Sequence, residues 1–197
     1  MSDQNGTSTR RPAVTSHDRN RRQIRRLTQG AVLTALALVL SIVERWIPLD
    51  LIVPIPGIKL GLANIVTLFA LLRLSPLDAA IILLIRSFVM GLITGPTTLM
   101  FSLAGGTLAL LVMWLLSRFE GRAFSLVGIS VAGAAAHNIG QISVGVLLLS
   151  EPLLYLMYLP PLLLAGLVTG TLTGIAAFPI AARFSRREKM PDNRLRG

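Results

Sequence analysis

The sequence predicts an all-α integral membrane protein with six transmembrane helices. Of its 197 residues, 53% are hydrophobic and only 14% are charged, which is too apolar for a soluble domain of this size. Several runs contain no charged side chain, and with their flanks they can cross a hydrocarbon core about 30 Å thick. These runs are apolar at every position rather than at every second one, which argues against a β-barrel.

The first two expected helices differ in length. The first, residues 27–49, begins with an uncharged run directly after an arginine-rich tail. A twin-arginine or secretory signal has the same pattern, but further apolar segments follow, which favours a retained transmembrane helix. The second, residues 60–72, starts after the helix-breaking segment 54–57 and is short for a span. Short spans bordered by Gly and Pro are typical of helices that line a cavity.

The other four helices are separated by short connections. A tight turn at residues 73–76 precedes the third helix, and a loop with Arg118 and Arg122 separates the fourth from the fifth. Uncharged runs over residues 108–116 and 162–180 indicate the fourth and sixth helices. The expected ranges of these four helices are 77–93, 98–119, 124–149 and 153–178.

Two basic tails flank the expected helical domain of residues 27–184. Residues 1–26 show no apolar periodicity and are expected to be disordered, and residues 185–197 form the second tail. Sixteen Lys and Arg residues fall on the side of both tails and two on the other side. The positive-inside rule then predicts cytoplasmic termini in a bacterial-type plasma membrane. We interpret the net charge of +10 as a topology signal and expect no nucleic-acid partner.

Arg86 is expected near the middle of the membrane, about nine residues or ~14 Å into the third helix. An arginine that faces lipid at this depth costs from ~3 to more than 10 kcal/mol, so it needs a partner. One candidate is Glu44, at the outer end of the first helix. The alternative is an anionic ligand.

Other polar side chains have the spacing of a binding site. Lys59 lies where the free N–H groups of the second helix favour an anion, although a lysine at the membrane boundary can also snorkel. Residues 137, 138 and 141 share one helix face, as expected for ligand contact or for hydrogen bonds between helices. We predict that a small anionic molecule contacts Lys59, Asn64, Arg86, His137, Asn138 and Gln141.

Motifs for catalysis and nucleotide hydrolysis are missing from the sequence. It has no cysteine, no GxxxxGK[ST] loop, no HExxH motif and no aspartate-rich segment that would chelate Mg²⁺ for a prenyl diphosphate. We therefore expect no catalytic residue, no metal site and no cofactor. Transport or prenyl transfer would require a separate protein.

Three motifs resemble one known family. They are the run from Pro56 to Leu68 (PGIKLGLANIVTL), the segment 86–91 followed by Gly95-Pro96, and HNIGQ at residues 137–141. They are similar to the Gx transporter family, whose members are widely described as heptaprenyl diphosphate synthase component I. The resemblance covers about residues 27–184.

That family is similar in turn to the substrate-binding S components of energy-coupling factor vitamin transporters. This resemblance implies an S-component-like bundle and a partner-docking role for Ala31 and Ala35. These two residues stand four apart on the first helix, a spacing that permits close approach of another helix. The implied partners are a transmembrane coupling subunit and ATPases.

Three functions are consistent with the sequence. The first is a membrane protein that binds and transports a small anionic solute. The second is a non-catalytic accessory subunit of a polyprenyl diphosphate synthase in isoprenoid quinone biosynthesis, with a soluble prenyltransferase as partner. The third is a scaffold in which Arg86 pairs with Glu44. In each case the lipid bilayer surrounds the helices.

Overall fold

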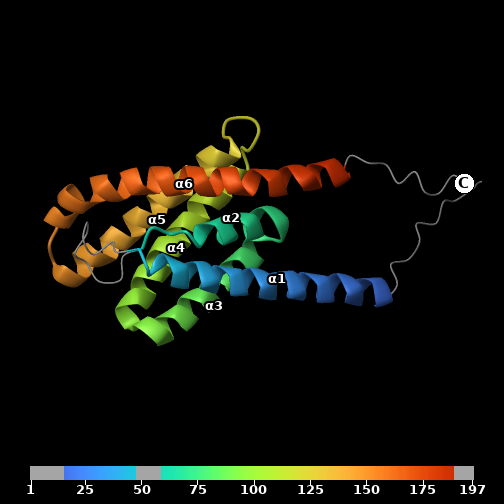
Figure 1. Cartoon of the computed structure of the whole chain (residues 1–197), viewed down its shortest axis with the longest axis horizontal. Helices are drawn as coiled ribbons and strands as arrows, with labels where there is room; N and C mark the ends of the chain where they lie inside the picture. The colour runs from blue at the N-terminus through green and yellow to red at the C-terminus, as the bar shows by residue number, and fades with distance from the viewer. Residues whose placement is uncertain (1–15, 48–58, 189–197) are drawn as a thin grey trace, which may run out of the picture.

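The computed structural model describes residues 16–47 and 59–188, and these ranges are almost entirely helical (Figure 1). No β-strand is formed within them, which confirms the predicted all-α fold. The helices are α1 (Ser16–Glu44), α2 (Asn64–Arg73), α3 (Pro76–Thr94), α4 (Pro96–Ser117), α5 (Leu126–Leu149) and α6 (Leu153–Glu188).

Five of these six helices are long and apolar enough to cross a membrane, and α2 is the exception. Its 10 residues extend over about 15 Å, half of the hydrocarbon thickness. The prediction of six spanning helices is therefore confirmed for five of them. Figure 1 shows the start of α1 and the end of α6 at the same end of the bundle.

Helix α1 begins before the expected boundary. The basic tail was expected to be irregular up to residue 26, but the chain is helical from Ser16 onward. Arginine and glutamine are good helix formers, so this polar segment extends the apolar helix that follows it. At the other end of the chain, α6 continues to Glu188, beyond the expected domain boundary at residue 184.

Small residues bring α5 and α6 into close contact. A Cβ atom added to Gly170 would lie 2.7 Å from the Cα atom of Val131, and one added to Gly174 would lie 2.7 Å from that of Val127. Helix α5 packs mainly against α4 and α6, while α1 packs against α3 and α2. The glycines of α6 therefore pack inside the bundle.

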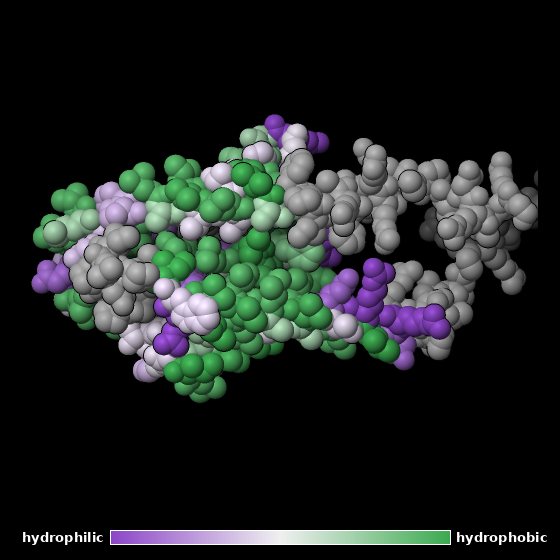
Figure 2. Space-filling view, in the orientation of Figure 1, coloured by the Kyte–Doolittle hydropathy of each residue, from purple (hydrophilic) through white to green (hydrophobic). Residues whose placement is uncertain are grey.

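The apolar side chains of the long helices largely face outward. Leu92, Leu147 and Leu156 are more than 70% exposed, while several charged and amide side chains are buried. Figure 2 shows apolar residues over the middle of one face and hydrophilic residues toward its ends. This distribution is the one expected of a protein surrounded by lipid.

Replacement of Gly140 by alanine should destabilise the bundle by about 1–3 kcal/mol, because the added methyl group overpacks the α4–α5 contact. The new Cβ atom would lie 2.8 Å from both the Ala104 carbonyl oxygen and the Gly105 Cα atom. Gly30→Ala is the matched control, since a Cβ atom there has no neighbour within 4 Å. Unfolding in detergent measures both variants, and equal losses of stability would contradict the prediction.

Candidate anion-binding site

A cluster of buried polar side chains lies where α1, α3, α4 and α5 meet the segment that precedes α2. Glu44, Arg86 and His137 are each at most 5% exposed, although they lie in helices that face lipid on the outside. We call this cluster the polar core. It surrounds a cavity lined by Ser41, Glu44, Lys59, Gly61, Arg86, Ser87, Met90, Ser102 and His137.

Glu44 fixes the backbone that leads into α2. Its Oε1 atom accepts hydrogen bonds from the backbone N–H groups of Gly61 and Leu62, the latter at 3.3 Å. Gly61 has a φ of +82°, which favours glycine. A Cβ atom at this position would also lie 2.8 Å from both Asn64 Nδ2 and His137 Cδ2. The turn therefore requires a glycine beside a carboxylate.

Gln141 holds the backbone of Lys59 from the opposite side. Its side-chain Oε1 accepts a hydrogen bond from Lys59 N–H at 2.7 Å, and its Nε2 donates one to the Lys59 carbonyl at 2.8 Å. The Lys59 Nζ atom donates to Ser102 Oγ at 3.3 Å. This pair of backbone hydrogen bonds positions the Lys59 ammonium inside the bundle.

Arg86 is buried in α3 without a direct partner in the described part of the chain. Its side chain is 5% exposed, and no hydrogen bond or ion pair to it is found there. Glu44 acts on Arg86 electrostatically, but the carboxylate hydrogen-bonds to the backbone before α2. The N–H donors of the Arg86 guanidinium are therefore available for hydrogen bonds to another acceptor.

Several other buried polar atoms have no hydrogen-bond partner among the described residues. They include both ring nitrogens of His137, the Ser87 hydroxyl and the side-chain amide of Asn64. An unsatisfied buried donor or acceptor costs about 1–3 kcal/mol. Such atoms next to a buried arginine are typical of a binding site rather than of a packed core.

The polar core carries more positive than negative formal charge. Lys59 lies outside the spanning helices, and burial lowers its pKa to about 8 against the opposing effect of Glu44, so it stays mostly protonated at neutral pH. Lys59 and Arg86 thus face a single carboxylate. The cavity of about 10 Å³ holds one water-sized group. This arrangement can bind one small anionic group.

The structure places the six predicted ligand residues in different roles. Lys59, Arg86 and His137 line the cavity. Asn64 lies beside Gly61 as the first residue of α2, rather than one turn inside it as expected, and Gln141 holds the Lys59 backbone. Asn138 donates from Nδ2 to the Leu162 carbonyl at 2.6 Å and so joins α5 to α6.

Three serines of the polar core were not predicted from the sequence. The hydrogen bonds that Glu44 accepts from the backbone before α2 were not predicted either. Ser41 and Ser87 lie near charged residues, three before Glu44 and directly after Arg86, and this proximity was a usable signal. Ser102 is the one that contacts Lys59 Nζ. Nothing in its sequence neighbourhood distinguishes it from other serines in apolar helices.

The two predicted docking residues lie outside the polar core. Ala31 and Ala35 are exposed on α1 and line a groove of about 880 Å³ between α1 and α3. The groove is open to the surroundings of the bundle and is mostly apolar along its length. Its shape permits close approach of another helix but does not identify one.

The fold and the polar core define a multi-pass helical membrane protein with a buried, positively charged cluster. The chain belongs to the heptaprenyl diphosphate synthase component I family, whose sequence profile matches residues 33–179. This match reaches from α1 into α6 and confirms the family resemblance drawn from the three motifs. No curated protein and no solved structure matches the chain.

Proposed function

We propose that this chain is the membrane-embedded, non-catalytic component of a prenyl diphosphate synthase system and that its polar core binds a small anionic group. The observation that carries the second part is a pair of cations, the buried Arg86 and the half-buried Lys59, which Glu44 alone opposes among the residues that line the cavity. The family supports the first part. A soluble prenyltransferase would then supply the metal-binding aspartates.

The size of the cavity limits how the anion binds. A space of about 10 Å³ admits one oxygen-sized group, not a whole diphosphate. The ligand therefore places a single charged oxygen between the Arg86 guanidinium and the Lys59 ammonium. Hydrogen bonds between charged partners are about twice as strong as neutral ones, which favours an anion over water.

The topology inferred from charge places the catalytic partner on the cytoplasmic side. Both basic tails belong to that side under the positive-inside rule. A cytoplasmic prenyltransferase bound there would release its long apolar product directly next to the bilayer.

Transport of a small anionic solute is the second candidate. The exposed ridge of Ala31 and Ala35 favours it, because small residues on a lipid-facing helix allow a partner helix to approach closely. In this case the chain would work with a transmembrane coupling subunit and ATPases. Co-purification from the native membrane distinguishes these partners from an aspartate-rich prenyltransferase.

Arg86→Met should weaken anion binding roughly tenfold or more, because it removes charge-assisted hydrogen bonds worth about 1.5–3 kcal/mol. The measurement is thermal unfolding of the purified full chain titrated with chloride, inorganic phosphate or pyrophosphate. A bound anion stabilises the folded state and raises the midpoint of unfolding with concentration. Arg86→Lys tests whether charge alone is enough.

Arg118→Met is the matched control for this titration. Arg118 stacks on the Trp114 ring at 4.2 Å, far from the polar core in sequence and outside the lining of its cavity. This variant should keep the response of the unmodified protein. Equal loss in Arg86→Met and Arg118→Met, or no response of the unmodified protein to any of the three anions, would reject the anion site.

A further inference from the structure

Lys59 is the one lysine within residues 16–47 and 59–188, and its amine lies inside the polar core. Two hydrogen bonds to the Gln141 side chain, of 2.7 and 2.8 Å, hold its backbone against α5. The Nζ atom has one long contact, to Ser102 Oγ at 3.3 Å. The amine therefore points into the bundle, unlike a lysine that extends along the surface toward water.

The Lys59 amine has no ion pair with a carboxylate among the described residues. Glu44 lines the same cavity, but its Oε1 atom accepts from the backbone N–H groups of Gly61 and Leu62. Burial lowers the pKa of Lys59 to about 8, while Glu44 opposes this effect and Arg86 adds to it. An enclosed lysine beside a second cation is a typical nucleophilic amine at neutral pH.

Other residues around the cavity provide the groups that covalent chemistry at a lysine requires. The donors of Arg86 have no partner in the described part of the chain, and a guanidinium binds carboxylates well. Both ring nitrogens of His137 are also without a partner there, so this imidazole can take up a proton and return it. The cavity of about 10 Å³ admits one oxygen-sized group, which restricts the ligand to a short molecule.

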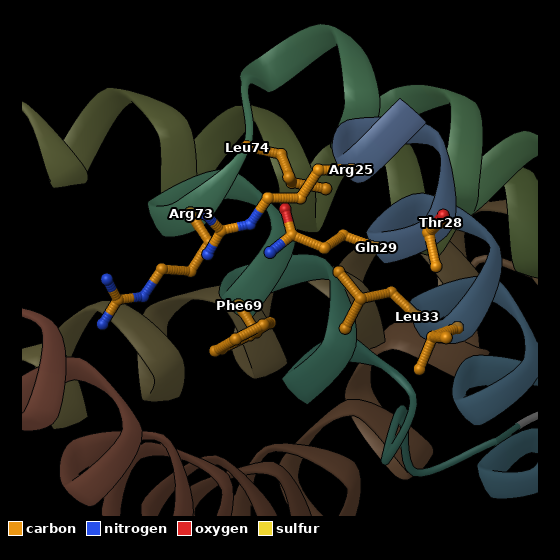
Figure 3. A pocket seen from close by; sticks show the side chains of 8 residues that line it. Arg25, Thr28, Gln29, Leu33, Phe69, Arg73 and Leu74 are labelled. Atoms are coloured by element: carbon orange, nitrogen blue, oxygen red, sulfur yellow. The ribbon is translucent and has the colours of Figure 1, made fainter. Parts of the chain in front are cut away.

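The larger pocket between α1 and α2 contains no such amine. Its volume is about 460 Å³, and Figure 3 shows Arg25 and Gln29 of α1 and Phe69 of α2 at its wall. Guanidinium groups stay protonated in proteins, so they are not nucleophiles. Among the described pockets, covalent chemistry at an amine is thus confined to the polar core.

We propose that Lys59 binds short 2-oxo acids covalently, as an imine whose carboxylate is held by Arg86. The Nζ lone pair attacks the carbonyl carbon, a C=N bond replaces the C=O bond, and the oxygen leaves as water. Two protons of the Lys59 ammonium end in that water, with His137 as their carrier, and the nitrogen keeps its positive charge. The iminium and Arg86 then face the ligand carboxylate and Glu44, so the charges balance.

This inference rests on the anion site proposed above and adds a covalent bond to it. Reductive trapping in the purified full chain tests it. Glyoxylate is added with cyanoborohydride, whose hydride reduces the imine to a stable secondary amine, and peptide mass spectrometry compares Lys59 with Lys189, the other lysine of the chain. Lys59 should react roughly tenfold faster at neutral pH, because its amine is activated. Equal or slower reaction of Lys59 would overturn the proposal.

Acetaldehyde, which carries no charge, separates the reactivity of the amine from the binding of the carboxylate. Arg86→Met should slow trapping by glyoxylate roughly tenfold and trapping by acetaldehyde less than about threefold. Arg118→Met is the matched control and should leave both rates unchanged. Inorganic phosphate should slow glyoxylate trapping in the unmodified protein, which tests the same contact without a variant. Equal slowing of both aldehydes in Arg86→Met, or no protection by phosphate, would overturn the role of Arg86.

Two outcomes separate a failure of this inference from a failure of the anion site. Thermal stabilisation by phosphate without fast trapping at Lys59 would overturn the covalent step and leave the anion site in place. Fast trapping by acetaldehyde, with no preference for glyoxylate relative to Lys189 and no stabilisation by any anion, would reject both.

Discussion

Glu44→Ala should destabilise the protein by about 3–5 kcal/mol, the cost of breaking a buried charged contact by removing one partner. The carboxylate is 3% exposed and accepts the N–H groups of Gly61 and Leu62. Without it, two backbone donors lose their acceptor and Arg86 and Lys59 lose the only described acidic side chain beside them. The start of α2 should therefore loosen together with the polar core.

Glu44→Gln separates the effect of the negative charge from the effect of the backbone hydrogen bonds. The amide oxygen still accepts from the backbone, but the negative charge is gone, so the loss should be smaller than for alanine. Reversible unfolding in detergent by added dodecyl sulfate measures both variants, with the fluorescence of the two tryptophans as the signal. A glutamine variant as unstable as the alanine variant would mean that charge dominates over the backbone hydrogen bonds.

The helices of this chain could largely be predicted from its apolar runs, because in lipid the backbone must satisfy its own hydrogen bonds. The expected ends of the third, fourth and fifth helices lie within two residues of α3, α4 and α5. The start of α2 could not be predicted this way. It depends on Glu44, 17 residues before Gly61 in sequence, and sequence patterns do not contain such a contact.

Only some residues of the polar core could be predicted from the sequence. Arg86 and Lys59 stood out because charged residues are rare in spans and costly there. The helical spacing placed Asn138 with His137 and Gln141, but in the structure Asn138 reaches α6 instead. Side chains three or four positions apart on a helix lie near one another but point in somewhat different directions. A shared face therefore does not determine which neighbouring helix each side chain meets.

The position of the anion was predicted at the free N–H groups before the second helix. In the structure the protein's own carboxylate occupies those donors, since Glu44 accepts from Gly61 and Leu62. The unmatched positive charge lies instead at Lys59 and Arg86. The proposed anion would therefore offset the excess positive charge of Lys59 and Arg86 over Glu44, and would not cap α2.

Exchange of the two charges, Glu44→Arg with Arg86→Glu, should leave the protein at least as unstable as Glu44→Ala, a loss of about 3 kcal/mol or more. A simple ion pair would tolerate this exchange, because opposite charges remain opposite. Here an arginine at position 44 has no acceptor for the N–H groups of Gly61 and Leu62. It would also place a cation next to Lys59, where the carboxylate of Glu44 stood before.

The doubly neutral variant, Glu44→Gln with Arg86→Gln, is the reference for the exchange. It removes both charges and keeps an acceptor for the backbone, so it should be more stable than the exchanged variant. The unfolding free energies of the unmodified protein, of Glu44→Gln, of Arg86→Gln and of this double variant form a cycle that isolates the coupling between the two positions. Recovery of most of the lost stability by the exchanged variant would show that the direct Glu44–Arg86 attraction, rather than the backbone contact, holds the polar core together.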